Sequence, residues 1–345
     1  MHDRPAATAV TGIQPSGRLH LGNYLGMVLP LLEISAGAGS YVFLADMHAL
    51  TTQRDAERVR RMSADLAATL LALGLAETGA LLYRQSDVPE VGALSWLLAC
   101  ALPKGRLNRM HAYKAVVAEN RKAGRHDHHG VSAGVYYYPL LMAADVVALG
   151  ADVVPVGADQ KQHVEIAQAC AIAFNNRYGD VLTVPRESIA PGIETVPGTD
   201  GNKMSKSRDN VVPVMAEPAE LRQIVSSIVT DSRGAGAPKD PSSCTVFALY
   251  ALMAGKEEVD TMRRRYLDGS ITYAEAKSAV VELLENRFAP ARARHRELLC
   301  APEHIEDVLR AGAAAARPRI RAIVGRAFEA AGLSAAAFAE PHPAG

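Results

Sequence analysis

Apolar residues in the first half of the chain alternate between two spacings. Short apolar runs indicate buried strands, and longer segments with apolar residues three and four apart indicate helices. The predicted strands lie at 8–13, 41–45, 81–84, 152–157 and 181–184. The predicted helices lie at 54–73, 91–101, 138–149 and 159–175, and another follows the glycines of residues 17–26. Strands that alternate with helices predict a parallel sheet wrapped by helices, and therefore an α/β fold.

After about residue 214 the strand signals cease. The segments with helical spacing there are 218–229, 245–254, 256–267, 272–294 and 304–328. The chain should therefore divide into an α/β domain at 1–213 and an all-helical domain at 214–330. A tail rich in Ala and Pro, 331–345, is expected to be loose.

Composition narrows the class of protein. The 345 residues include 37 Lys and Arg against 37 Asp and Glu, a formal net charge of zero, and 49% are hydrophobic. This excludes a disordered chain and a polybasic coat, although a local patch could still bind a polyanion. Arginines near the C-terminus are candidates for that patch or for ordinary solvated helix faces: Arg292, Arg294, Arg296, Arg310, Arg317, Arg319, Arg321 and Arg326.

Cysteine spacing and hydropathy argue against metal-binding, disulfide-rich and membrane proteins. The four cysteines lie far apart without a CxxC pair, which argues against a zinc site and a disulfide framework, so we expect buried thiols and no metal site. No apolar run approaches the roughly 20 residues that span a bilayer, and the first residues lack the apolar core of a signal peptide. We expect a cytoplasmic protein that does not enter membranes.

The sequence T-G-I-Q-P-S-G-R-L-H-L-G-N, residues 11–23, spans the end of the first predicted strand and the residues directly after it. Gly12 and Gly17 allow a tight turn, and the next helix begins with unpaired N–H groups, which predicts an anion site. His20 and Asn23 share a face of that helix and can both donate to phosphate oxygens, while Gly22 permits close approach. Taken alone, a glycine-rich turn with a surface histidine is the less favoured alternative.

A second motif, G-N-K-M-S-K-S, occupies residues 201–207. Lys203 and Lys206 lie three positions apart with serines between and after them. Mobile cations of this kind suit the charge that develops on a leaving pyrophosphate. Alone, this motif could be a solvated loop.

Together the two motifs resemble the paired signatures of class I aminoacyl-tRNA synthetases. Residues 138–145 (Y-P-L-L-M-A-A-D) and 153–163 (V-V-P-V-G-A-D-Q-K-Q-H) closely resemble the bacterial tryptophanyl branch of that family, and the similarity extends from Thr11 to about Arg326. The resemblance implies a Rossmann-like nucleotide-binding domain, a mobile signature loop at 201–207 and a C-terminal helical domain that binds the tRNA anticodon. It implies L-tryptophan, ATP and tRNA(Trp) as substrates, a homodimer, and no membrane or DNA partner. Mg²⁺ would arrive with ATP and without dedicated protein ligands.

The resemblance also implies roles for individual residues. Those expected to take part in catalysis are His20, Asn23, Lys203 and Lys206. Those expected to hold ATP are Gln14, Pro15, Ser16, Gly22, Asn23, Gly157, Ala158, Asp159, Val196, Lys203, Met204, Ser205, Lys206 and Ser207. Those expected to hold tryptophan are His48, Tyr138, Met142, Asp145 and Gln160.

Within this set, Asp145 would accept the indole N–H, Met142 would pack on the ring, and Tyr138 and Gln160 would reach the amino-acid head group. The residues themselves support one part of this assignment, because a carboxylate inside an apolar helix needs a donor. A salt bridge between helices is the alternative role for Asp145.

Two positions depart from the usual bacterial pattern. His20 stands where the family usually has Thr, and it moves toward the general class I signature. Ala158 stands where Glu is usual, which leaves only its backbone for ATP. The segment 196–201 is shorter than in many relatives, and the adenine contact is placed at Val196.

Residues 104–136 interrupt the alternation because they are basic, polar and weakly periodic. We predict a helical insertion with a mobile loop, in the region of the dimer contact and the tRNA acceptor end. Its cations either contact the phosphates of ATP or tRNA or are solvated: Lys104, Arg106, Arg109 and Lys114. A solvated loop is favoured over a metal site for the histidines His126, His128 and His129.

Three other functions remain open from the sequence. A tyrosyl-tRNA synthetase shares the fold but should have a glutamine where Met142 stands. Another nucleotidyltransferase of the superfamily usually lacks the second motif. A synthetase paralogue could bind tryptophan as a regulator or resistance factor.

Overall fold

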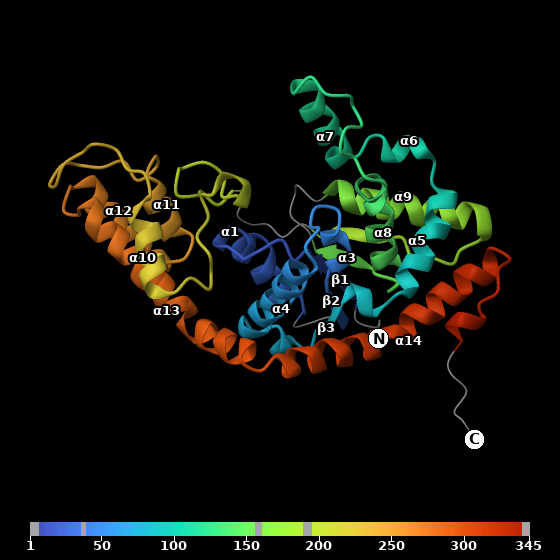
Figure 1. The fold of residues 1–345 in the computed structure, drawn as a ribbon. Helices are drawn as coiled ribbons and strands as arrows, with labels where there is room; N and C mark the ends of the chain where they lie inside the picture. The colour runs from blue at the N-terminus through green and yellow to red at the C-terminus, as the bar shows by residue number, and fades with distance from the viewer. Residues whose placement is uncertain (1–6, 36–38, 156–160, 189–194, 340–345) are drawn as a thin grey trace, which may run out of the picture.

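A five-stranded parallel sheet forms the centre of the protein (Figure 1). The structure, a computed structural model, describes residues 7–35, 39–155, 161–188 and 195–339. In the spatial order β3-β2-β1-β4-β5, the strands are β1 (Thr8–Ile13), β2 (Gly39–Leu44), β3 (Leu81–Arg84), β4 (Val153–Pro155) and β5 (Arg186–Ser188). The order reverses between β1 and β4, the place where open α/β sheets bind ligands at the carboxyl ends of their strands. The predicted fold class is confirmed.

The last strand lies later in the sequence than predicted. The strand expected at 181–184 is wrong, because Asn175 Oδ1 accepts the backbone N–H groups of Val181 (3.2 Å) and Leu182 (2.9 Å). Leu182 instead turns its side chain into the core. The chain becomes extended only at β5, where Arg186 lies opposite Val153 of β4.

Helices cover both faces of the sheet. After β1 the chain forms α1 (Leu21–Asn23), a π-helical turn (Tyr24–Val28) and α2 (Leu29–Ser35). The helices that follow up to β5 are α3 (Asp46–Ala49), α4 (Ala56–Ala72), α5 (Glu90–Ala101), α6 (Lys104–Leu107), α7 (His111–Lys122), α8 (Ala133–Val147) and α9 (Lys161–Tyr178). One hydrophobic core includes α4 and residues of the C-terminal helices, and a second includes α5, α8 and α9.

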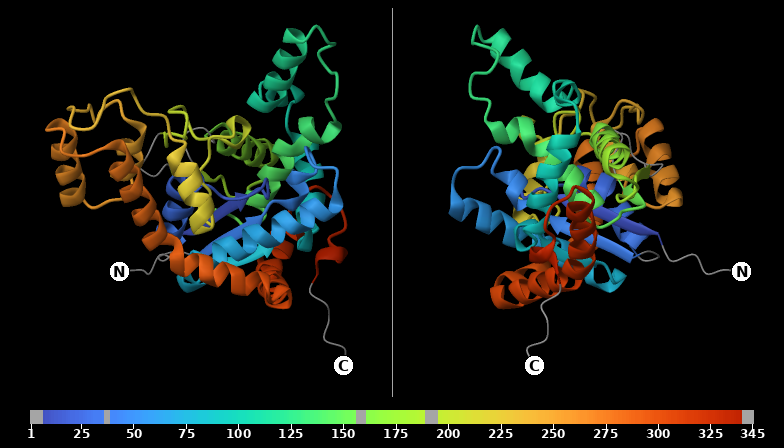
Figure 2. Two further views of the ribbon diagram at one scale, coloured as in Figure 1. Left: turned by 60° about the vertical axis from the view of Figure 1, so that its left-hand side comes forward. Right: turned by 90° about the vertical axis from the view of Figure 1, so that its right-hand side faces the viewer.

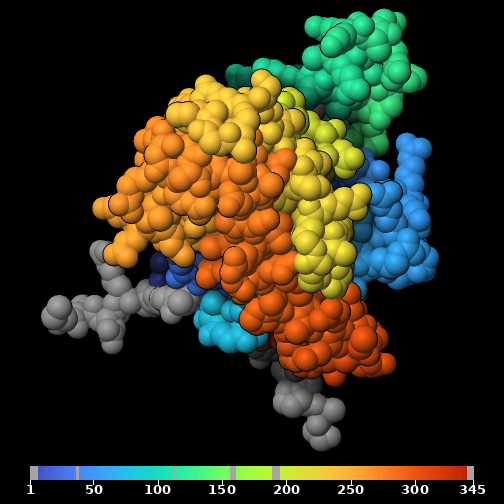
Figure 3. Space-filling model, turned by 90° about the vertical axis from the view of Figure 1, so that its left-hand side faces the viewer, coloured from blue at the N-terminus to red at the C-terminus, as the bar shows by residue number. Residues whose placement is uncertain are grey.

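The C-terminal region is helical, as predicted. Its helices are α10 (Pro218–Ser226), α11 (Thr245–Ala251), α12 (Lys256–Leu267), α13 (Tyr273–Leu299) and α14 (Pro302–Ala330). Figure 3 shows α10–α13 as a continuous surface on one side of the molecule, and α13 packs against α4.

Helix α14 turns back beneath the sheet and packs against β3 and α5 (Figures 1 and 2). Its early residues Ile305 and Leu309 belong to the first core, whereas Ala316 and Ile320 belong to the second. Between them lies Gly312, where a Cβ would fall 2.0 Å from the Leu82 carbonyl oxygen. The helical region is therefore not a body apart from the sheet, because its last helix joins the two cores.

Most of the arginines that were candidates for a basic surface make contacts within the protein. Arg317 (2.7 Å) and Arg321 (2.8 Å) both donate to the buried carboxylate of Glu90 on α5. Arg319 donates to the carbonyl of Leu149 at 2.6 Å, and Arg292 is buried. Other pairs are Arg294–Glu297, Arg296–Glu217 and Arg310–Asp307. A major role of this run is to fasten α13 and α14 to the rest of the chain.

The insertion that contains α6 and α7 stands away from the body, most clearly in Figure 2. The loop after α7 is tied down, because Asn120 donates to the carbonyls of Asp127 (3.1 Å) and His129 (2.8 Å). His126 and His128 place their rings 5.3 Å apart. No group of three or more potential metal ligands occurs in the part of the chain that the structure describes.

The cysteines and the tail differ in part from expectation. Cys170 and Cys244 are buried, but Cys100 and Cys300 are exposed. Residues Ala336–Phe338 form a 3₁₀ turn, and Phe338 packs on Phe328 with ring centroids 4.7 Å apart, so the beginning of the tail is ordered against α14. None of the helices described is both long and apolar enough to cross a bilayer.

Candidate active site

The first motif forms a turn and a reciprocal helix cap at the carboxyl end of β1. Gly17 has φ +109°, which L side chains rarely adopt. The Nδ1 atom of His20 accepts the backbone N–H of Asn23 at 3.3 Å, and Asn23 Oδ1 accepts the N–H of His20 at 3.4 Å. Because Nδ1 of His20 accepts, the ring proton of the neutral imidazole lies on Nε2.

Burial lowers the pKa of His20 to about 4, and the nearby Lys206 cation lowers this pKa in the same direction. The ring is therefore neutral near pH 7. It can donate one hydrogen bond from Nε2 to a phosphate oxygen, but it supplies no positive charge. The positive charge closest to His20 is instead that of Lys206 in the second motif.

The structure brings the two motifs into contact. Lys206 Nζ donates to the carbonyl of Gly17 at 2.9 Å and to Ser16 Oγ at 3.2 Å. The N–H of Gly22 points at Met204 Sδ, 3.4 Å away, and Met204 is buried. Met204 thus anchors the loop against α1, while Lys203 and Lys206 remain exposed at its surface.

Asn210, which the sequence analysis did not identify, fixes the shape of the second motif. Its buried side chain accepts the N–H of Ser205 at 2.8 Å and donates to Asp200 Oδ1 at 2.6 Å. Ser205 and Ser207 pair through their hydroxyls at 2.8 Å. Val196 is buried and its carbonyl accepts the N–H of Met204 at 2.9 Å, so the residue predicted for the adenine contact packs beside the second motif.

A second group of predicted residues lies past the ends of β2 and β3. Asp145 on α8 is only 2% exposed, and Gln85 Nε2 donates to its Oδ2 at 2.7 Å. Gln85 Oε1 lies 3.1 Å from Nδ1 of His48 on α3. Asp145 therefore takes part in a buried polar chain, and no salt bridge to Asp145 occurs among the described residues.

Burial raises the pKa of Asp145 well above its ordinary value, and the hydrogen bond from Gln85 opposes that rise. Burial also lowers the pKa of His48, so its ring favours the neutral form. The Nε2 atom of His48 is buried and makes no hydrogen bond of good geometry to the described residues. Hydrogen bonds with Gln85 and with the backbone of Tyr138 oppose this lowering of the His48 pKa.

The remaining predicted residues border the same region or lie outside the described chain. The Tyr138 ring packs edge-on against His48 with centroids 6.1 Å apart, and its hydroxyl lies 3.2 Å from His163 Nε2. Met142 is partly buried in the second core.

Gln14 links the first motif to this group, because its amide reaches the carbonyl of His48 at 3.5 Å. Pro15, the next residue, is buried. Gly157, Ala158, Asp159 and Gln160 lie outside the described residues.

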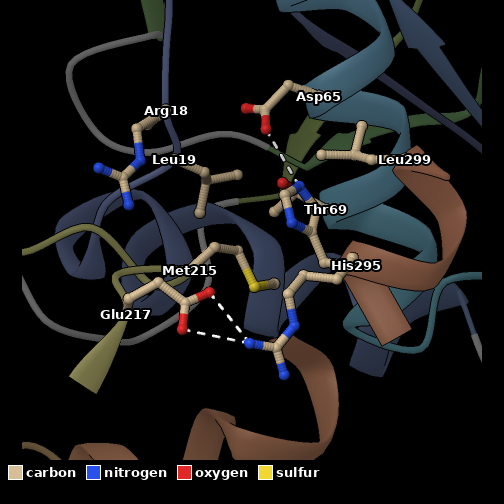
Figure 4. Close-up of a pocket in the computed structure, with 9 residues that line it drawn as sticks. Arg18, Leu19, Asp65, Thr69, Met215, Glu217, His295 and Leu299 are labelled. Atoms are coloured by element: carbon tan, nitrogen blue, oxygen red, sulfur yellow. Dashed lines mark hydrogen bonds and ion pairs between the residues drawn. The ribbon is translucent and has the colours of Figure 1, made fainter. Parts of the chain in front are cut away.

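A cavity of about 210 Å³ lies on the other side of the first motif, between α4 and α13 (Figure 4). Its charged lining residues are all paired: Asp65 with His295 at 3.0 Å, Glu217 with Arg296 at 3.2 Å, and Arg18 with Glu220 at 2.6 Å. The cavity therefore belongs to the contact between the sheet domain and the helical region. The predicted functional residues do not line it.

Known proteins match this arrangement across most of the chain. A family model for class I tRNA synthetases of the tryptophan and tyrosine group matches residues 2–289. The chain belongs to this family. The tryptophan–tRNA ligase of Pseudomonas aeruginosa is 44% identical over 329 residues, which cover 94% of this chain and 73% of that protein. The tryptophan–tRNA ligase of Rhodopirellula baltica is 42% identical over 94% of this chain and 99% of its own length.

Solved structures agree with the sequence relatives. A tryptophanyl-tRNA synthetase from Campylobacter jejuni, complexed with ADP and tryptophan, has a TM-score of 0.87 and 36% identity, with 94% of this chain and 100% of that chain covered. Membership of the class I synthetases confirms the resemblance drawn from the motifs. It also confirms the predicted enzyme class, an aminoacyl-tRNA ligase.

Proposed function

We propose that this chain is a tryptophan–tRNA ligase, which activates L-tryptophan with ATP and transfers it to tRNA(Trp). The observation that carries the proposal is the buried carboxylate of Asp145, whose side-chain donor among the described residues is the neutral Gln85. The indole N–H is a donor without acceptor capacity, so it matches a carboxylate oxygen. A site that hydrogen-bonds one particular substrate group rejects analogues that lack the group, without a separate editing step.

In the first step, a carboxylate oxygen of tryptophan attacks the α-phosphorus of ATP in line. A P–O bond to the tryptophan carboxylate forms, and the bond from the α-phosphorus to the bridging oxygen breaks, so that pyrophosphate leaves with its electron pair. In the second step, a terminal ribose hydroxyl of the tRNA attacks the carbonyl carbon of the adenylate, AMP leaves, and the hydroxyl proton is released. No enzyme nucleophile is needed, and positioning and electrostatics supply the rate enhancement.

The two motifs are assigned to ATP. Lys203 and Lys206 stabilise charge on the phosphates, and His20 donates from Nε2. Asn23, whose Oδ1 is engaged in the cap, keeps its amide N–H groups for phosphate. The other residues assigned to ATP are Gln14, Pro15, Ser16, Gly22, Gly157, Ala158, Asp159, Val196, Met204, Ser205 and Ser207.

The tryptophan site is assigned to the group around Asp145. Asp145 accepts the indole N–H, Met142 packs on the ring, and Tyr138 and Gln160 bind the head group. His48 lies beside the ring. Magnesium is assigned to the ATP phosphates, whose oxygens are the hard ligands this ion prefers.

The wider assembly follows from the substrates. The chain acts as a homodimer in the cytoplasm, where its tRNA is charged, and the insertion 104–136 lies toward the second subunit and the acceptor end. Contact with the anticodon is assigned to the helical region that begins at residue 214. Part of α14 is unavailable for this contact, because it packs beneath the sheet.

The test is tryptophan-dependent exchange of pyrophosphate into ATP, followed by charging of tRNA(Trp). We expect exchange with tryptophan and not with tyrosine, and esterification of tRNA(Trp). Exchange with tyrosine alone would show a tyrosyl-tRNA synthetase. Tryptophan binding without exchange or charging would show a regulatory paralogue.

A further inference from the structure

Gln85 lies at the centre of the candidate tryptophan site. It begins a 3₁₀ turn (Gln85–Asp87) directly after β3, and its side chain is fully buried. The amide group bridges α3 and α8, with 2.7 Å from Nε2 to Asp145 Oδ2 and 3.1 Å from Oε1 to His48 Nδ1. A buried amide in this position costs free energy unless both of its ends are hydrogen-bonded.

The structure gives the chain a direction. Gln85 Nε2 donates to Asp145 Oδ2, so Oε1 faces His48. An amide oxygen only accepts, and His48 therefore donates to it from Nδ1.

The arrangement leaves specific acceptors for a ligand. Gln85 occupies Oδ2 of Asp145 and leaves Oδ1 for another donor. Its hydrogen bond also opposes the protonation of Asp145 that burial favours, and a protonated carboxyl group would present a donor to the ligand instead of an acceptor. Gln85 therefore fixes the orientation of the carboxylate and favours the form that accepts.

We propose that Gln85 is a positioning residue for substrate specificity: by holding Asp145 Oδ2 and His48 Nδ1, it directs the free carboxylate oxygen to the indole N–H. The inference rests on the proposed function and deepens it. Gln85 does not contact the reacting atoms. Its role is to make the site prefer a ring that carries an N–H group to a ring of the same shape without one.

The experiment compares tryptophan with its benzothiophene analogue, in which sulfur replaces the indole N–H. Two variants are used: Gln85→Met removes both hydrogen bonds at similar volume, and Gln85→Leu removes them with a branched apolar side chain. We expect the preference for tryptophan over the analogue, as the ratio of kcat/KM in pyrophosphate exchange, to fall about tenfold or more in both variants. The KM for ATP should stay within about twofold.

Gln168→Met is the matched control, because Gln168 lies on α9 and binds the carbonyl of Pro185, away from the site. This control should retain the wild-type preference. In an Asp145→Asn background, Gln85→Met should cause little further loss of preference, since the two residues act through one contact. Thermal unfolding verifies that each variant is folded before its preference is measured.

Equal losses for tryptophan and the analogue would overturn the inference, because a packing role does not distinguish the two rings. The same comparison can be made by calorimetric binding of the two amino acids to each variant. If the wild-type protein binds tryptophan without exchange, the proposed enzymatic function fails while the binding preference still decides the role of Gln85. If the wild-type protein does not bind tryptophan, both proposals fail.

Discussion

Lys206 donates a hydrogen bond to the carbonyl oxygen of Gly17 at 2.9 Å, although 189 positions separate the two residues in the chain. Partial desolvation against the first motif lowers the pKa of Lys206, although the side chain is exposed, and the charge of Asp65 partly opposes this. The ammonium group is therefore placed against neutral oxygens of the first motif, where phosphate oxygens can replace them. The K-M-S-K-S loop is held against the first motif in this structure.

Lys206→Ala should lower kcat for tryptophan activation about 100-fold or more, because one preorganised charge-stabilising group is lost from the transition state. Binding of tryptophan should change little. Single-turnover formation of the adenylate measures the first quantity and calorimetry the second. Arg208→Ala, an exposed cation two residues later, is the control. A similar loss in both variants would assign the effect to general surface charge.

Asp145→Ala should raise the KM for tryptophan by about 10- to 100-fold, the range for a hydrogen bond to a charged group. The KM for ATP should rise far less. Pyrophosphate exchange with each substrate varied in turn gives both constants. If the two constants rise equally, Asp145 does not belong to the tryptophan pocket.

Asn210→Ala should lower kcat about tenfold and destabilise the protein by about 1–3 kcal/mol, because it leaves the N–H of Ser205 and the carboxylate of Asp200 without their buried partner. Denaturant unfolding and pyrophosphate exchange measure the two effects. Asn202→Ala is the comparison, since Asn202 also reaches Asp200 but is exposed. Comparable behaviour of both variants would show that Asn210 does not shape the loop.

Gly312→Ala should destabilise the protein by about 3 kcal/mol or more, because the added methyl group would collide with the backbone of Leu82 and overpack the contact between α14 and β3. Gly325→Ala in the same helix has its nearest neighbours at 3.7 Å and 3.9 Å. It should be neutral or stabilise by up to about 1 kcal/mol, since Ala favours helix. Unfolding in urea compares the two variants, and equal stabilities would contradict the predicted collision.

We expect the titration of His20 to lower the free energy of unfolding as the pH falls. Between pH 6.5 and about 4, the ring takes up a proton in the unfolded chain but not in the folded one, whose pKa is about 4. The stabilisation from this group is complete above pH 6.5 and is lost as the pH falls toward 4, with a slope of at most about 1.4 kcal/mol per pH unit. His20→Thr keeps a capping oxygen without a titrating group, so its unfolding free energy should fall less over that range. If the unfolding free energies of the wild-type protein and His20→Thr fall equally with pH, His20 does not have this role.

The sequence predicted the parallel sheet, most helices and the two motifs because these depend on local spacing and on residues close together in the chain. It did not reveal Gln85 or Asn210, since their importance depends on atoms of distant residues that meet only after folding. The strand expected at 181–184 failed for the same reason, because the side chain of Asn175 competes for its backbone N–H groups. Asp145 could be predicted as a candidate site residue from the sequence, because a carboxylate within an apolar helix needs a hydrogen-bond donor.

The placement of α14 also has a consequence for how the protein is made. Leu82 leaves the ribosome long before Gly312, so the nascent chain must keep β3 and one flank of α5 uncovered while more than 200 further residues are synthesised. Contacts of such sequence separation form late and slow the completion of folding. During that interval the exposed apolar flank is a natural target for chaperones, and the polypeptide reaches its final stability only when its last long helix emerges.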